Sequence, residues 1–171
     1  MLVPKNYIAC FWILASSCIF AQDQIVSSSL TKLSISSGES TSLSVIYNTT
    51  GQVQSTGLAI RLHYNSSALF CDESDTTDLL TESNIGSQLS NDVDDFDNDA
   101  NTDKYLIAAW ASINGNWPSN SPLPATLYTI ACTARDDFSG TTLRFSQISS
   151  ASGYGLVSSD ITISQRVIPI D

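Results

Sequence analysis

Apolar residues that alternate with Ser, Thr and other polar residues most limit the folds open to this chain. In the segments 41–47, TSLSVIY, and 57–64, GLAIRLHY, every second side chain is apolar. This period of two is typical of a β-strand with one face in a core, whereas an amphipathic helix needs apolar residues every three or four positions. The same alternation, or an unbroken apolar run, occurs in four further segments: 104–112, 125–134, 141–148 and 160–167. The pattern predicts an all-β protein.

The first 21 residues predict export. MLVPKNYIACFWILASSCIFA has one basic residue, Lys5, before an apolar stretch, and ends on a small residue, as a signal peptide does. The stretch from Tyr7 to Phe20 is shorter than the roughly 20 residues that span a bilayer. We therefore expect a secreted, periplasmic or cell-surface protein with no membrane span, although an N-terminal anchor is the alternative. The residues before Cys18 loosely resemble a bacterial lipobox, which leaves lipidation of Cys18 open.

Turn-forming residues separate the predicted strands, as in the cluster NTTG at 48–51. Short strands punctuated in this way favour an antiparallel β-sandwich. Residues 22–171 are enough for one domain with a substantial core and too few for two. We therefore expect a single sandwich domain after the leader.

Four cysteines are present, and the leader contains two of them. Cys71 and Cys132 would remain in an exported protein, where the surroundings are oxidising. A pair of cysteines in such a compartment favours one disulfide. Two separately buried thiols are the alternative.

The chain is strongly acidic, with a formal net charge of −10. This charge excludes binding to nucleic acid by neutralisation of phosphates. The segment 72–103 has no strand pattern and holds 11 of the 17 acidic residues. We predict that it is one long acidic loop, and loops of this length are usually functional or disordered.

Part of this segment suggests a calcium site. In NDVDDFDNDANTDKY, residues 91–105, carboxylates recur at alternate positions, and Ca²⁺ takes six to eight oxygen ligands. Ala100 and Leu106 stand where an EF-hand loop has Gly and Glu, so a looser calcium-bound loop is predicted. A hydrated acidic loop that aids solubility is the alternative. The predicted ligands are Asp92, Asp94, Asp95, Asp97, Asp99 and Asp103.

The order of three segments resembles the cohesin family. GLAIRLHYNSSALF (57–70) is similar to a cohesin strand that ends in Tyr and is followed by a polar turn and a Leu. KYLIAAWAS (104–112) and LYTIACTARDDFSGTTLRFS (127–146) resemble later cohesin strands. The resemblance covers about residues 28–165 and implies a jelly-roll sandwich of about nine strands. It also implies that Cys71 and Cys132 lie on neighbouring strands.

The resemblance implies a non-catalytic module that binds a protein partner of the dockerin type, in an extracellular or polysaccharide-related assembly. Alternation places the even-numbered residues of 58–64 and 106–110 in the core, and the cohesin sheet that receives dockerin helices corresponds to the outer face of these two strands. A flat apolar patch bordered by charge suits a protein partner, unless another loop covers it. We expect a monomer. The predicted partner-binding residues are Arg61, His63, Tyr105, Ile107 and Ala109.

The residues do not favour an enzyme. His63 is the only histidine, and a solvent-facing strand histidine is more often inert or a partner contact than catalytic. Paired carboxylates of the kind that hydrolyse glycosides could come only from a flexible loop without a rigid cleft. The sequence shows no phosphate-binding Gly-rich loop and no Cys or His metal motif.

Two aromatic residues suggest an alternative function. Trp117 lies in a segment rich in Gly, Asn and Pro, INGNWPSNSPLP, and Tyr154 lies in ASGYGLV. Exposed aromatic rings can stack on sugar faces. The alternative prediction is a carbohydrate-binding module that holds polysaccharide with these two rings, unless Trp117 packs as a lid over the sandwich edge.

Overall fold

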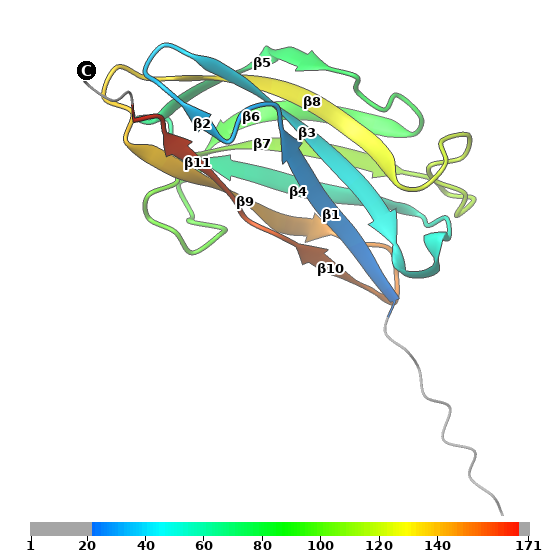
Figure 1. Cartoon of the computed structure of the whole chain (residues 1–171). Helices are drawn as coiled ribbons and strands as arrows, with labels where there is room; N and C mark the ends of the chain where they lie inside the picture. Colours follow the sequence, from blue (N-terminus) through cyan, green and yellow to red (C-terminus); the bar gives the residue numbers. More distant parts are fainter. Residues whose placement is uncertain (1–21, 168–171) are drawn as a thin grey trace, which may run out of the picture.

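The computed structural model describes residues 22–167, which form two β-sheets (Figure 1). The strand orders are β10-β1-β3-β8-β5 and β2-β11-β9-β4-β7-β6. The predicted antiparallel β-sandwich is confirmed, with eleven strands in place of about nine. The elements are β1 (Gln22–Leu30), β2 (Ser34–Ile35), β3 (Ser40–Thr49), the 3-10 turn η1 (Thr50–Gln52), β4 (Gly57–Tyr64), β5 (Leu69–Thr77), β6 (Asn84–Asn91), β7 (Lys104–Ala111), β8 (Ala125–Ala134), β9 (Gly140–Ser149), β10 (Tyr154–Ser158) and β11 (Ile161–Gln165).

The predicted leader, residues 1–21 with Cys18, lies outside the described residues. Across residues 22–167 no helix is long and apolar enough to span a membrane.

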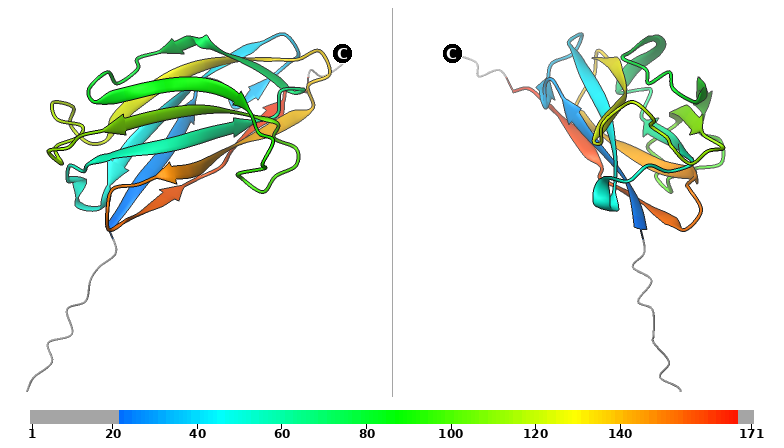
Figure 2. Two further views of the ribbon diagram at one scale, coloured as in Figure 1. Left: turned by 180° about the vertical axis from the view of Figure 1, so that it is seen from behind. Right: turned by 90° about the vertical axis from the view of Figure 1, so that its right-hand side faces the viewer.

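The first two and the last two strands of the described chain are divided between the two sheets. β1 pairs in parallel with β10 in the five-stranded sheet, and β2 pairs in parallel with β11 in the six-stranded sheet. The other strand pairs are antiparallel. Figure 2 shows the two sheets packed face to face. Each end of the described chain therefore contributes one strand to each layer of the sandwich.

The alternating apolar residues of the predicted strands form the core between the sheets. Leu58, Ile60 and Leu62 of β4 are at most 2% exposed, and Leu106 and Trp110 of β7 are equally buried. Loss of one such Leu side chain typically costs about 2–5 kcal/mol of stability. The strand β4 is unusual because its outer face is also largely covered, and only Arg61 is not classed as buried.

The prediction that residues 72–103 form one long loop is wrong. β5 continues to Thr77 and β6 occupies Asn84–Asn91, so the loop that remains before β7 is Asp92–Asp103. β6 is an edge strand with no fully buried residue. An edge strand that packs little apolar surface lacks the period-two signal, and its extended form comes from its pairing with β7.

Cys71 of β5 and Cys132 of β8 form a disulfide, which confirms the predicted pair. The two residues lie directly opposite each other in the β5–β8 ladder. The bridge joins positions 61 residues apart, and closing a loop of this size contributes about 4 kcal/mol in the chain-entropy model. It fastens the edge strand β5 to the interior of its sheet.

Candidate functional site

The loop between β6 and β7, residues Asp92–Asp103, folds against the outer face of the six-stranded sheet; it is the green loop at the lower left of Figure 1. Its ends are joined by a hydrogen bond from Asp92 N to Asp103 O of 2.8 Å. Asp95 and Asn98 have positive φ angles of 50° and 56°, a conformation that Asp and Asn tolerate better than most residues. We call this segment the β6–β7 loop.

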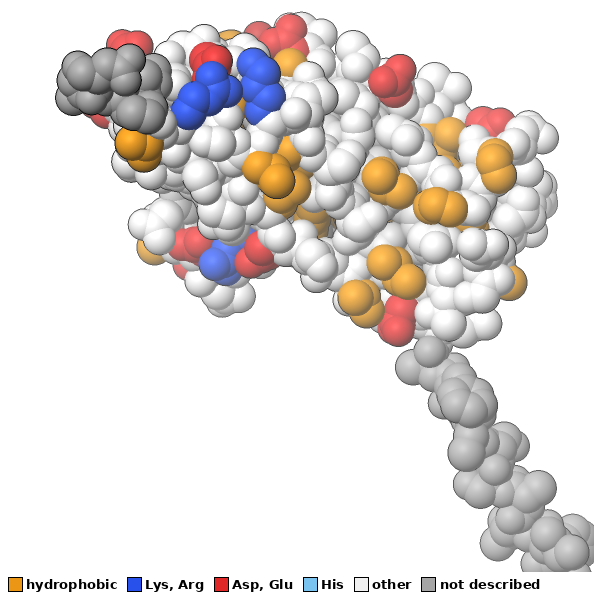
Figure 3. All heavy atoms as spheres, in the orientation of Figure 1, with side chains coloured by type: hydrophobic (Ala, Val, Ile, Leu, Met, Phe, Trp, Pro, Cys, Tyr) orange, Lys and Arg blue, Asp and Glu red, His pale blue; other side chains and the backbone are white. Residues whose placement is uncertain are grey.

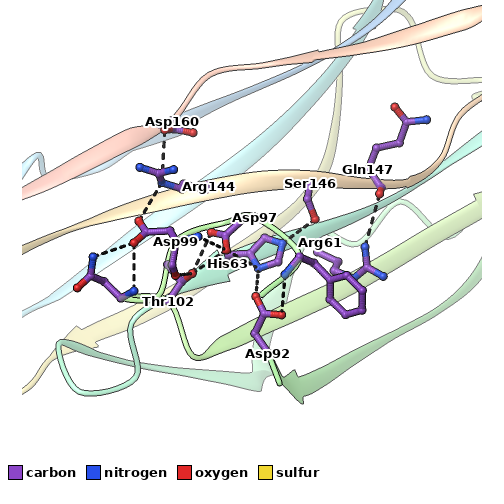
Figure 4. Close-up of polar contacts among 12 residues, drawn as sticks. Arg61, His63, Asp92, Asp97, Asp99, Thr102, Arg144, Ser146, Gln147 and Asp160 are labelled. Carbon is purple, nitrogen blue, oxygen red and sulfur yellow. Dashed lines mark hydrogen bonds and ion pairs between the residues drawn. The ribbon is translucent and has the colours of Figure 1, made fainter. Parts of the chain in front are cut away.

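His63 of β4 lies beneath this loop (Figure 4). Its Nδ1 is 2.7 Å from Asp92 Oδ2, and its Nε2 is 2.6 Å from Ser146 Oγ of β9. Asp97 Oδ1 is 3.8 Å from the same Nδ1. The prediction that His63 faces solvent is wrong, because its side chain is 0% exposed. The ring does lie on the outer face of the sheet, as alternation predicted, but the loop covers it.

The carboxylates of Asp92 and Asp97 are held from the other side by the loop itself. Phe96 N donates to Asp92 Oδ1 at 3.1 Å. The Thr102 hydroxyl lies 2.9 Å from both oxygens of Asp97 and 2.8 Å from the carbonyl oxygen of Asp99. These contacts fix both carboxylates toward the imidazole.

The other four predicted calcium ligands do not point toward this position. Asp94 and Asp95 are exposed, Asp99 turns toward Arg144, and Asp103 binds the backbone N and the hydroxyl of Ser66 at 2.6 and 2.5 Å. The structure therefore does not assemble the six carboxylates around one point. Calcium binding in this loop stays a prediction. Of the six carboxylates, only those of Asp92 and Asp97 lie close enough together, with His63, to hold one metal ion.

Hydrogen bonds hold Asp99 and Asp103 in their charged forms. A backbone hydrogen bond from Asn101, together with its side chain and the charge of Arg144, lowers the pKa of Asp99 below its usual value. Burial raises the pKa of Asp103, but hydrogen bonds from Ser66 outweigh this effect and the pKa is lowered. Arg144 Nε lies 3.2 Å from Asp99 Oδ2 and 3.6 Å from Asp160 Oδ2; these are ion pairs, since Nε makes no hydrogen bond of good geometry.

Phe96 at the tip of the β6–β7 loop covers a second part of the sheet. The Arg61 guanidinium lies 3.8 Å from the centre of the Phe96 ring, and the rings of Phe96 and Tyr105 meet edge to face at 5.9 Å. Tyr105 is only 9% exposed as a result. The expectation that Tyr105 is exposed on this face is therefore wrong. We call Arg61, His63 and Tyr105 the covered region.

The rest of the predicted partner face is open. Ile107 and Ala109 of β7 are partly exposed and line a shallow hollow of about 360 Å³ with β6. Ile85 of β6 is 69% exposed at its edge. We call Ile85, Gln88, Ile107 and Ala109 the open region. The structure thus divides the five predicted partner-binding residues between two environments.

Trp117 does not have the exposed position that carbohydrate stacking requires. It is 0% exposed, and its ring centre lies 4.5 Å from that of Tyr47 and 5.7 Å from that of Trp110. Two backbone hydrogen bonds with Ser55 hold the loop in place. The expectation that the Trp117 ring is exposed for stacking on a sugar is wrong, and the ring packs against the sandwich as the lid alternative predicted. Tyr154, at the start of β10, is partly exposed.

Ser146, His63 and Asp92 are connected in the order of a Ser-His-Asp triad. In a serine hydrolase the imidazole exchanges protons with the nucleophile and with the leaving group. Here the imidazole is fully buried and both of its nitrogens are engaged, so a substrate could not contact it unless the β6–β7 loop moved. The arrangement anchors the loop to the sheet.

Sequence reasoning missed Ser146, Thr102 and Phe96. Ser146 lies opposite Arg61 in the β4–β9 ladder, and alternation in β9 could have placed it on the outer face. No local signal identifies Thr102 or Phe96, because their roles depend on how the loop folds.

Comparison with known proteins identifies the fold. No protein-family model matches the sequence, and no curated protein sequence matches it. Among solved structures, a type II cohesin from the cellulosome of Acetivibrio cellulolyticus matches with a TM-score of 0.54 and 13% identity, over 82% of this chain and 95% of that chain. A type I cohesin–dockerin complex from Clostridium thermocellum matches with a TM-score of 0.55 and 8% identity, over 86% and 96%.

A type I cohesin from Pseudobacteroides cellulosolvens also matches, with a TM-score of 0.52 and 9% identity, over 88% of this chain and 96% of that chain. At such identities the similarity concerns the fold. The sandwich that carries the covered and open regions has the cohesin fold.

Proposed function

We propose that this chain is an exported, non-catalytic binding module that holds a protein partner of the dockerin type on the open region of its six-stranded sheet. The observation that carries the proposal is the hollow between β6 and β7, lined by Ile85, Ile107 and Ala109. Partly exposed apolar side chains on a regular sheet suit a protein partner better than a small polar ligand. The fold supports the proposal, because two of the matching solved structures are cohesins in complex with dockerins.

The opposite face of the sandwich is less suited to this role. Figure 3 views the molecule from the side of the five-stranded sheet, where apolar side chains appear as separate spots on a surface that is otherwise mostly uncharged. Ser44 and Thr129 are hydrogen-bonded to each other on this sheet at 3.0 Å. A surface of paired hydroxyls offers little apolar area to a partner.

The test is binding of the purified mature chain to immobilised type I and type II dockerins, measured by surface plasmon resonance. Ile107→Asp places a charge in the hollow and should abolish binding. Ile113→Asp is the matched control, since Ile113 is 100% exposed outside the open region, and it should bind as the unchanged protein does. Because Ile107 is partly exposed, Ile107→Asp should lower the free energy of unfolding by only about 0.5–1 kcal/mol.

Two results would contradict the proposal. One is equal dockerin binding by the two variants, which would place the interface elsewhere. The other is that the unchanged chain binds neither dockerin type, which would show that its partner is not a dockerin of these types.

A further inference from the structure

The structure brings one histidine and two carboxylates together in a place closed to water. Ligand atoms of His63, Asp92 and Asp97 all lie within 4.8 Å of one another. The three side chains are 0%, 0% and 2% exposed. Burial of carboxylates is costly unless a positive charge or strong hydrogen bonds compensate for it.

The positive charge within this cluster does not balance the negative charges of its two carboxylates. A neutral imidazole leaves the three side chains with a charge of −2, and a protonated one leaves −1. The nearby arginines act elsewhere: Arg144 pairs with Asp99 and Asp160, and the Arg61 guanidinium lies on Phe96. Nδ1 of His63 can donate one hydrogen, and it is used at 2.7 Å by Asp92 while Asp97 stays at 3.8 Å.

Other polar groups of the loop and of β9 already hold the same three side chains in place. Nε2 of His63 meets Ser146 Oγ at 2.6 Å, Phe96 N donates to Asp92 Oδ1, and the Thr102 hydroxyl lies 2.9 Å from both oxygens of Asp97. Hydrogen bonds of this kind orient metal ligands in proteins, and a ligating imidazole almost always has one on its second nitrogen. The cluster is therefore preorganised, with three ligand atoms facing inward.

We infer that His63, Asp92 and Asp97 form a binding site for a divalent transition-metal ion such as Zn²⁺. The imidazole gives the lone pair of Nδ1 and donates its Nε2 hydrogen to Ser146, and each carboxylate gives one oxygen. The ion and the two carboxylates together are neutral. Imidazole is a common ligand for zinc, whereas calcium takes oxygen ligands alone, so the ion differs from the calcium that the sequence pattern suggests.

A metal at this position would connect the β6–β7 loop to β4. His63 belongs to the sheet, whereas Asp92 and Asp97 belong to the loop. The ion would favour the conformation in which the covered region is closed. This inference does not depend on the partner proposed for the open region.

The direct test is titration of the untagged mature chain with ZnCl₂ by isothermal calorimetry, together with ¹⁵N spectra of histidine-labelled protein. The chain has a single histidine, so one pair of ring nitrogen signals reports on the site. One Zn²⁺ per chain should bind, the Nδ1 signal should shift, and Nε2 should carry the ring proton in the zinc-bound form. A hundredfold excess of free Zn²⁺ over its Kd should raise the melting temperature by about 5–10 °C.

Asp97→Asn removes one ligand charge with little change of shape, and Asp94→Asn makes the same change at an exposed position of the same loop. Zn²⁺ affinity should fall at least tenfold in the first variant and stay unchanged in the second. Equal affinities, no stoichiometric Zn²⁺ binding by the unchanged chain, or stabilisation by Ca²⁺ without any by Zn²⁺ would each overturn the inference. The calorimetry and the ¹⁵N spectra of the unchanged chain decide the question even if Asp97→Asn fails to fold.

Discussion

The covered and open regions lie on the same face of the same sheet, and their sequences have the same alternation, yet they differ in exposure. In the covered region the β6–β7 loop buries His63 and Tyr105. In the open region Ile107 and Ala109 have no such cover and line a hollow. The comparison shows that alternation along a strand decides which side of a sheet a residue occupies, and that a separate segment decides whether water reaches it.

The largest difference between the regions should appear when His63 is removed. His63→Leu leaves the carboxylates of Asp92 and Asp97 buried without the imidazole beside them, and a buried charge that loses its partner in this way costs about 3–5 kcal/mol. Gln88→Leu also replaces a polar side chain by leucine, but at an exposed position of the open region, and it should change stability by only about 0.5 kcal/mol. Urea denaturation in chelator, which removes any metal contribution, measures both. Similar small losses in the two variants would mean that the loop is held by other contacts.

A smaller difference should follow from Phe96→Ala. The change removes the ring that lies on Arg61 and Tyr105, and we expect a loss of about 1–2 kcal/mol from apolar contact and the cation–π interaction. Val93→Ala is the control, because Val93 is 87% exposed in the same loop. Hydrogen exchange should show faster exchange of the loop amides in Phe96→Ala alone. Unchanged exchange would show that Phe96 rests on the sheet without fastening the loop.

The smallest effect concerns the C-terminal end of the loop, where Ser66 binds Asp103. Because the pKa of Asp103 is lowered in the folded protein, the stabilisation from its charged form is present above the unfolded pKa of about 3.9 and is lost as the pH falls through the folded value. Ser66→Ala removes the hydroxyl donor, so the pKa of Asp103 should rise toward its usual value. Carboxyl ¹³C chemical shifts followed from pH 2 to 6 measure this change. A pKa that does not move would assign the effect to the Ser66 backbone amide.

Much of the fold could be predicted because its central strands are strongly patterned. GLAIRLHY gave the bounds of β4 and the correct direction of each side chain, and the two cysteines outside the predicted leader gave the disulfide. The strands β1 and β6 were missed because they contain many polar residues and little alternation. Their extended form depends on neighbours that are distant in the sequence.

The site was harder to predict than the fold. His63 and Asp92 are separated by 29 positions, and His63 and Ser146 by 83. The density of carboxylates in the loop suggested a cation, but it could not show that only Asp92 and Asp97 turn inward or that a histidine meets them. Those details depend on local turns and on the register of β4 with β9.

The parallel pairs β1–β10 and β2–β11 have a mechanical consequence. β1 begins at one end of the sandwich, and β11 finishes near the other (Figure 1). A pulling force applied between these points would run along both strands. Because the hydrogen bonds of β1 with β10 and β3, and of β11 with β2 and β9, lie across the strands, such a force would load each ladder in shear, with many bonds sharing the tension. The fold is therefore arranged to resist extension by its ends more strongly than it would resist a force that peels one strand away.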